Sequence, residues 1–153
     1  MSPKSPKLVL IVDDEPMDIR TMRNILESTK EFSVVSANDY DEAVRVFERR
    51  GSDVVLALID VALPGKNGVE LAKNLLATNP DLRVLFVSGH VGASVIRFYG
   101  INASDEHFLQ KPFDNKLLLQ RVHQAIAGQG ALELILSATT SGPSDDESTT
   151  SGD

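Results

Sequence analysis

Acidic, hydroxyl and ammonium side chains stand at the ends of apolar runs in this sequence. One run ends on the pair Asp13 and Asp14, another on Asp60, and two later runs end on Ser88 and Lys111. Carboxylates that are brought together repel one another and raise each other's pKa unless a cation is present. The combination therefore predicts a site for a hard divalent cation, Mg²⁺ in particular, and for the phosphate oxygens that such a cation accepts as further ligands.

Each of these residues also has an ordinary structural explanation when it is taken alone. Asp14 could cap a helix that begins near Pro16, and Asp60 could hydrogen-bond its own turn, which the following proline and glycine favour. Ser88 could satisfy backbone groups where the chain leaves its strand, and Lys111 could be a solvated surface lysine. Each explanation accounts for one residue, whereas a shared site accounts for all of them.

Five aliphatic or β-branched runs are the candidate strands that would position these residues. They lie at 8–12, 32–37, 53–59, 83–88 and 106–110, and the third and fourth are apolar nearly throughout, as is typical of strands covered on both faces. The segments between them have helical spacing, as in Ile19, Met22 and Leu26. This alternation predicts an α/β fold with a parallel sheet, and ligands of such sheets bind at the carboxyl ends of the strands.

Helix boundaries are also marked in the sequence. Asn38 and Asp39 precede the second predicted helix, Asn67 the third and Asp114 the fifth, and each can accept a hydrogen bond from a first-turn amide. Gly128 is predicted to end the fifth helix in the left-handed conformation.

Composition limits the classes of function. The chain has 153 residues, 42% of them hydrophobic, which suits one compact domain. The net charge of -7, with bases spread singly, argues against nucleic-acid binding. There is no cysteine, and no apolar stretch is long enough to cross a membrane. We expect a soluble cytoplasmic protein that binds neither nucleic acid nor membrane.

Four motifs in order resemble the receiver domain of two-component response regulators. They are VDDE (12–15), DVALPGKNG (60–68), VSGH (87–90) and FLQKPF (108–113), and the resemblance spans 7–127. It implies a CheY-like, flavodoxin-like doubly wound fold, with a five-stranded parallel sheet in the order 2-1-3-4-5 flanked by five helices. It also implies a cis peptide bond between Lys111 and Pro112.

The resemblance implies a role for each site residue. Asp60 would accept a phosphoryl group from the phosphohistidine of a histidine kinase or phosphotransfer protein. Asp14 would bind Mg²⁺ directly, Asp13 largely through water, and the backbone carbonyl of Ala62 would complete the protein ligands.

The remaining roles concern the response to phosphorylation. Ser88 and Lys111 would contact the phosphoryl group, and Phe108 would occupy the aromatic switch position, where many members have tyrosine. The fourth helix, fifth strand and fifth helix would form the surface for a downstream protein. Apolar residues between 91 and 99 support that interface, although core packing is the alternative.

The ends of the chain differ in composition from residues 7–127. Residues 1–6 are predicted to be a flexible N-terminus, and 137–153 a disordered acidic tail rich in serine and threonine. Between them, 128–136 form an apolar C-terminal extension. The hypothesis for this extension is an arm that docks on a second copy, giving a homodimer, or on the fourth-to-fifth helix face. The alternative is that it continues the fifth helix and packs on its own domain.

Three functions remain open from the sequence. The preferred one is a phosphorylated signalling receiver, not a turnover enzyme, either acting alone or derived from a hybrid kinase. The second is a pseudo-receiver that binds partners without phosphorylation, against which the complete set of acids, Ser88 and Lys111 counts. The third is a Mg²⁺-dependent phosphohydrolase, which would lack a general acid because Ala62 stands two residues after Asp60.

Overall fold

A five-stranded parallel sheet forms the centre of the molecule. The computed structural model describes residues 5–89 and 107–128. The strands run in the order β2-β1-β3-β4-β5, and every neighbouring pair is parallel. This order confirms the prediction. The strands are β1 (Lys7–Val12), β2 (Phe32–Ala37), β3 (Val54–Ile59), β4 (Arg83–Ser88) and β5 (Phe108–Gln110).

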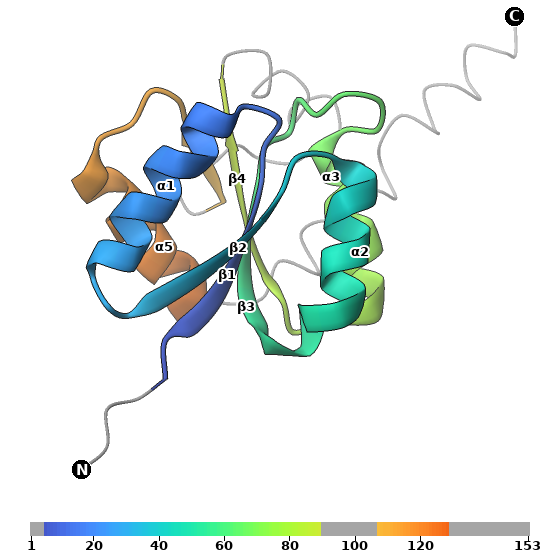
Figure 1. The fold of residues 1–153 in the computed structure, drawn as a ribbon, viewed down its shortest axis with the longest axis horizontal. Helices are drawn as coiled ribbons and strands as arrows, with labels where there is room; N and C mark the ends of the chain where they lie inside the picture. The colour runs from blue at the N-terminus through green and yellow to red at the C-terminus, as the bar shows by residue number, and fades with distance from the viewer. Residues whose placement is uncertain (1–4, 90–106, 129–153) are drawn as a thin grey trace, which may run out of the picture.

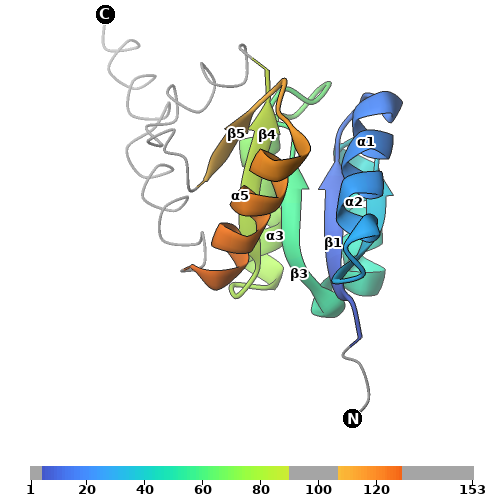
Figure 2. The ribbon, with the colours of Figure 1, turned by 90° about the vertical axis from the view of Figure 1, so that its left-hand side faces the viewer.

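Helices cover both faces of the sheet. Helices α1 (Pro16–Ser28) and α5 (Asn115–Ala127) lie on one face, and α2 (Tyr40–Arg50) and α3 (Gly68–Thr78) lie on the other (Figures 1 and 2). A 3-10 turn (Gly51–Asp53) joins α2 to β3. The expected fourth helix, with the apolar residues between 91 and 99, lies outside the described residues, as do 129–136 of the extension and the acidic tail.

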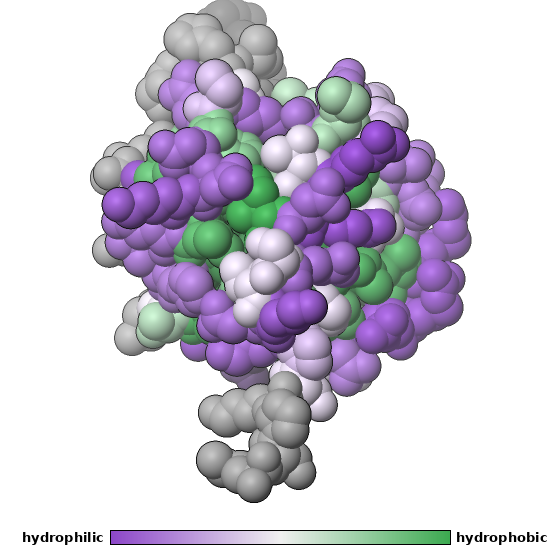
Figure 3. Space-filling view, turned by 60° about the vertical axis from the view of Figure 1, so that its left-hand side comes forward, coloured by the Kyte–Doolittle hydropathy of each residue, from purple (hydrophilic) through white to green (hydrophobic). Residues whose placement is uncertain are grey.

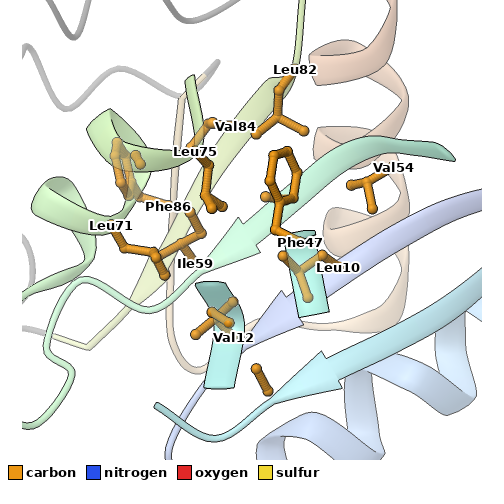
Figure 4. Packing of buried hydrophobic residues seen from close by; sticks show 14 of the residues in the cluster. Leu10, Val12, Phe47, Val54, Ile59, Leu71, Leu75, Leu82, Val84 and Phe86 are labelled. Atoms are coloured by element: carbon orange, nitrogen blue, oxygen red, sulfur yellow. The ribbon is translucent and has the colours of Figure 1, made fainter. Parts of the chain in front are cut away.

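Alternate residues of each strand enter different apolar layers. In β1, Leu8, Leu10 and Val12 belong to the cluster that packs on α2 and α3, whereas Val9 and Ile11 belong to the cluster that packs on α1 and α5. This division follows from the two-residue period of a strand. It explains why β3 and residues 8–12 of β1 are continuously apolar. Figure 4 shows the first of these clusters, with side chains from the two helices and the strands in contact.

Three of the predicted helix caps are confirmed. Asp39, Asn67 and Asp114 each accept a hydrogen bond from a first-turn amide, donated by the residues at 42, 70 and 117. Helix α1 differs, because its N-cap residue is Glu15 and no side chain caps it. Its first helical residue is Pro16, which has no N–H to satisfy. The capping role considered for Asp14 is therefore not the one that this acid has.

Several predicted boundaries need correction. Asp53 belongs to the 3-10 turn and not to β3, and His107 lies in a turn before β5. Helix α5 ends at Ala127 as expected, but Gly128 is extended (φ -86°, ψ -167°) and not left-handed. In this conformation its carbonyl accepts a hydrogen bond from Arg83 Nε, 3.1 Å away. A contact with β4 thus takes the place of the predicted local motif.

The outer surface on the side of α1 and α5 is mainly hydrophilic, with hydrophobic side chains visible in the gaps between polar ones (Figure 3). Among the described residues, the one large hydrophobic side chain that is strongly exposed is Met17, in the first turn of α1. No helix in 5–89 or 107–128 is long and apolar enough to span a bilayer.

Candidate functional site

Backbone hydrogen bonds carry the sheet one residue beyond its strands, to the candidate acids. The amide of Asp13 donates to Ala37 O (3.2 Å), and the amide of Asp60 donates to Val12 O (2.9 Å). At the neighbouring strand end, the amide of Lys111 donates to Ser88 O (2.9 Å). Because parallel strands end at the same edge, these bonds bring the predicted residues together and fix their backbones.

Three carboxylates meet at this edge. One oxygen each from Asp13, Asp14 and Asp60 lies within 4.8 Å of the other two. Asp13 is fully buried and Asp60 nearly so, whereas Asp14 is exposed. The arrangement offers two fixed acids and one accessible acid, so the oxygens can face a small cation that approaches from solvent.

The two oxygens of Asp60 have different surroundings. Oδ1 accepts hydrogen bonds from Ser88 Oγ (2.7 Å) and from the backbone amide of Ala62 (2.9 Å). Among the residues that the structure describes, Oδ2 has one longer contact, with Lys111 Nζ at 3.3 Å. Oδ1 is therefore held by two donors, and Oδ2 is the freer oxygen.

Lys111 supplies the positive charge of the cluster. Its Nζ lies 2.7 Å from Asp13 Oδ2, 2.7 Å from Asp18 Oδ2 and 3.3 Å from Asp60 Oδ2. The bond between Lys111 and Pro112 is cis, as predicted. The ammonium has three N–H donors, and three carboxylates of the described residues surround it.

The electrostatics of the cluster follow from burial and from this pairing. Burial raises the pKa of the Asp13 carboxyl above its ordinary value, and hydrogen bonds from Lys111 and the Glu15 amide offset only part of that effect. Burial alone would lower the pKa of Lys111, but its hydrogen bonds to Asp13 and Asp18, with the nearby charge of Asp60, raise it. Lys111 is therefore cationic at neutral pH, among more carboxylates than it can neutralise.

The chain turns away sharply after Asp60. Gly65 has a positive φ of 77°, and the amide of Gly68, the first residue of α3, donates to Val61 O (2.8 Å). A Cβ on Gly68 would lie 2.4 Å from the carbonyl oxygen of Asp60. Helix α3 can begin against the acid only because this residue has no side chain.

The other residues singled out in the sequence lie at or near this edge. Ala62 is exposed two residues after Asp60. Phe108 is buried at the start of β5, in the apolar cluster on the α2 and α3 face. Asp18 was not singled out. The available signal was an acid in the first turn of a helix at the same edge, but its contact with a lysine 93 positions later has no local pattern.

Curated proteins of different kinds contain a segment that is similar to this chain. The chain is 30% identical over 118 residues to a cyclic di-GMP phosphodiesterase of Thermotoga maritima, which covers 77% of this chain and 30% of that protein. It is 31% identical over 124 residues to the transcriptional regulatory protein DegU of Brevibacillus brevis, covering 80% and 51%. The chain thus spans about half the length of these curated relatives, or less.

The fold is also similar to solved structures. The CheX-CheY-BeF3-Mg complex from Borrelia burgdorferi contains a chain that aligns with a TM-score of 0.69 at 24% identity, covering 80% of this chain and 91% of that one. The family model for the response regulator receiver domain matches residues 9–123. Together with the strand order and the acidic edge of the sheet, this match shows that the chain belongs to the response regulator receiver domain family.

Proposed function

We propose that this receiver accepts a phosphoryl group on Asp60, with Mg²⁺ bound beside it, and that phosphorylation changes a protein-binding surface. The observation that carries the proposal is the arrangement around Asp60. Asp60 directly follows the buried strand β3, and it has the acids that follow β1 on one side and Ser88 and Lys111 on the other.

The donor set fits Mg²⁺. Asp13, Asp14 and Asp60 provide hard carboxylate oxygens within 4.8 Å of one another, and the described residues of the cluster include neither a nitrogen nor a sulfur ligand. The carbonyl of Ala62, on the exposed turn, is the fourth ligand that we assign. When it is bound, Mg²⁺ neutralises charge on the acids and on the transferred phosphoryl oxygens.

Asp60 is the nucleophile in this proposal. Its Oδ2, the less restrained oxygen, attacks the phosphorus of a phosphohistidine. The new bond joins Oδ2 to phosphorus, and the bond from phosphorus to the imidazole nitrogen breaks, with its electron pair going to that nitrogen. A carboxylate is already ionised, so no general base is needed. Lys111, 3.3 Å from Oδ2, is placed to balance charge on the incoming oxygens.

Ser88 and Phe108 would report the phosphorylated state. Ser88 Oγ donates to Asp60 Oδ1 before phosphorylation, and a phosphoryl oxygen would offer it a new acceptor. Movement of Ser88 toward that acceptor would leave space for Phe108, which lies on the neighbouring strand: Phe86 of β4 pairs with it. Two packings of one aromatic residue are sufficient for a two-state response.

The partners that we propose are a histidine kinase or phosphotransfer protein as the donor and a downstream protein as the target. The family's occurrence in regulators such as DegU supports a signalling role. The expected target surface includes β5 and α5, and its remainder lies outside the described residues. Homodimer formation and a cytoplasmic location stay predictions.

Phosphotransfer can be tested with a small phosphodonor. The protein is incubated with acetyl phosphate, with and without Mg²⁺, and the added mass is located by peptide mass spectrometry. We expect one phosphoryl group on Asp60, dependent on Mg²⁺, and none in Asp60→Asn. Retention of the label in that variant would place the acceptor elsewhere. A folded wild-type protein that remains unlabelled with this donor and with histidine kinases would favour a phosphorylation-independent role.

A further inference from the structure

Asp18 is the third carboxylate around Lys111 and the most accessible of the three. The fractional exposure of its side chain is 40%, compared with 1% for Asp13 and 9% for Asp60. It lies at the third position of α1, on a turn that begins with Pro16. Its backbone is thus fixed by the helix, while its carboxylate is partly in water.

The three contacts described for Lys111 equal in number the three hydrogens of its ammonium. Nζ has one close carboxylate oxygen from each acid, at 2.7, 2.7 and 3.3 Å. Phosphorylation makes Asp60 Oδ2 the ester oxygen, so the N–H that faces it at 3.3 Å can turn to a phosphoryl oxygen. A shorter contact with that oxygen draws the ammonium away from one of the two acids that it holds at 2.7 Å. The released acid determines how much free energy the change requires.

The costs of release differ among the three acids. Release of Asp13 would leave a fully buried carboxylate without its cation, and this release would require the most free energy. Asp60 carries the phosphoryl group, so the ammonium stays beside it. Asp18 can be hydrated as soon as the ammonium leaves, because its carboxylate already faces solvent. The contact between Lys111 and Asp18 is therefore the one that breaks.

We infer that Asp18 is a positioning residue that holds the Lys111 ammonium toward α1 before phosphorylation and releases it to the phosphoryl group afterwards. The inference rests on the proposed phosphorylation of Asp60. It assigns Asp18 an effect on the rate of phosphorylation, exerted through Lys111. Because the pair is partly exposed, the restraint is modest, and removing it should accelerate labelling of Asp60 by about two- to fivefold.

Asp18→Asn tests this role, with Asp41→Asn as the matched control. Asp41 is also an exposed first-turn acid of a helix that begins at the carboxyl edge, in α2. Each variant removes one negative charge and one favourable helix-dipole interaction. The described contacts of Lys111 include Asp18 and not Asp41. Only Asp18→Asn should therefore change the position and the hydrogen bonds of the ammonium.

The first measurement follows the ¹⁵N signal of Lys111 Nζ in the metal-free protein by NMR. In the wild type and in Asp41→Asn, we expect an ammonium whose hydrogens exchange slowly with water. In Asp18→Asn the signal should shift and the hydrogens should exchange faster. An unchanged signal would show that Asp18 does not hold the ammonium in solution, and it would overturn the inference.

The second measurement is the rate of labelling of Asp60 by acetyl phosphate. Faster labelling in Asp18→Asn, with the wild-type rate in Asp41→Asn, is the expected result. Equal rates in all three proteins would overturn the role of Asp18 and leave the proposed function intact. Equal acceleration in both variants would also overturn it, because a general charge effect would then be responsible. If wild-type Asp60 takes no label, the proposed function fails and this inference fails with it.

Discussion

The apolar layers and the carboxyl edge of the sheet obey opposite rules. In the layers, the buried side chains are aliphatic or aromatic and alternate between the two faces. At the edge lie Asp13, Asp60 and Ser88, which are the buried polar residues of the described chain. In the described part of the chain, the edge contains more carboxylates than cationic groups, so it gains little stability from its own contacts. The difference teaches that the layers stabilise the fold and the edge is arranged for binding.

The strongest test of this division is a substitution within the apolar layers. Leu75 of α3 is 1% exposed and packs in the cluster on the α2 and α3 face. We expect Leu75→Ala to lower the free energy of unfolding by about 2–5 kcal/mol, because it removes buried contacts and leaves a cavity. Urea unfolding followed by circular dichroism measures this loss. The labelling rate of Asp60 in the folded variant should stay at the wild-type value, and a large change in that rate would break the division.

A substitution at the edge should have the opposite effect on stability. Asp14→Asn removes the accessible acid of the cluster, so we expect Mg²⁺ affinity to fall by about tenfold, or ~1.4 kcal/mol of binding free energy. Without metal, the variant should be at least as stable as the wild type, because repulsion within the cluster is relieved. Isothermal titration calorimetry and urea unfolding give the two quantities. Unchanged Mg²⁺ affinity would remove Asp14 from the metal site.

The pH dependence of stability separates the edge from the layers in another way. The pKa of Lys111 is raised in the folded protein above its ordinary value of 10.5. Its contribution to stability is thus fully present below pH 10.5 and is lost as the pH rises through the folded-state pKa. Between about pH 9.5 and about pH 11.5, the unfolding free energy of the wild type should fall by ~1 kcal/mol more than that of Lys111→Met. Parallel curves for the two proteins would contradict this.

The smallest effect concerns an acid at the same edge with a purely structural role. Asp114 caps α5 through a 2.7 Å hydrogen bond from the Leu117 amide. Asp114→Ala should lower the unfolding free energy by about 0.5–1 kcal/mol, without changing Mg²⁺ affinity. The contrast in sign with Asp14→Asn sharpens the comparison. Similar destabilisation by both substitutions would mean that Asp14, too, serves the fold.

Much of the fold followed from local patterns in the sequence. The order of strands and helices came from apolar runs and helical spacing, and three caps came from polar residues before those helices. The meeting of Asp13, Asp60, Ser88 and Lys111 followed from one rule, that parallel strands end at the same edge. These features depend on backbone periodicity, which a sequence expresses directly.

The features that were missed depend on contacts between distant residues. Asp18 and Lys111 meet because a long side chain reaches from the end of β5 to α1. Gly128 is extended where its carbonyl accepts from Arg83, 45 positions earlier. Neither contact corresponds to a repeating pattern of residue types in the sequence. Asp53 lies in a 3-10 turn because of the local backbone hydrogen bonds. An aspartate can occur in such a turn or at the start of a strand, so its residue type does not predict which.

Gly68 has a consequence for how tolerance to mutation is interpreted in this chain. A methyl group at this position would meet the backbone of Asp60 and Val61 and the side chain of Ile59 at 2.4–2.8 Å. Backbone atoms give way far less easily than the end of a flexible side chain. In a saturation library selected for signalling, position 68 would therefore be as intolerant as position 60. At position 68, substitutions would fail because α3 has no space for a side chain there. At position 60, they would fail because no other side chain replaces the carboxylate.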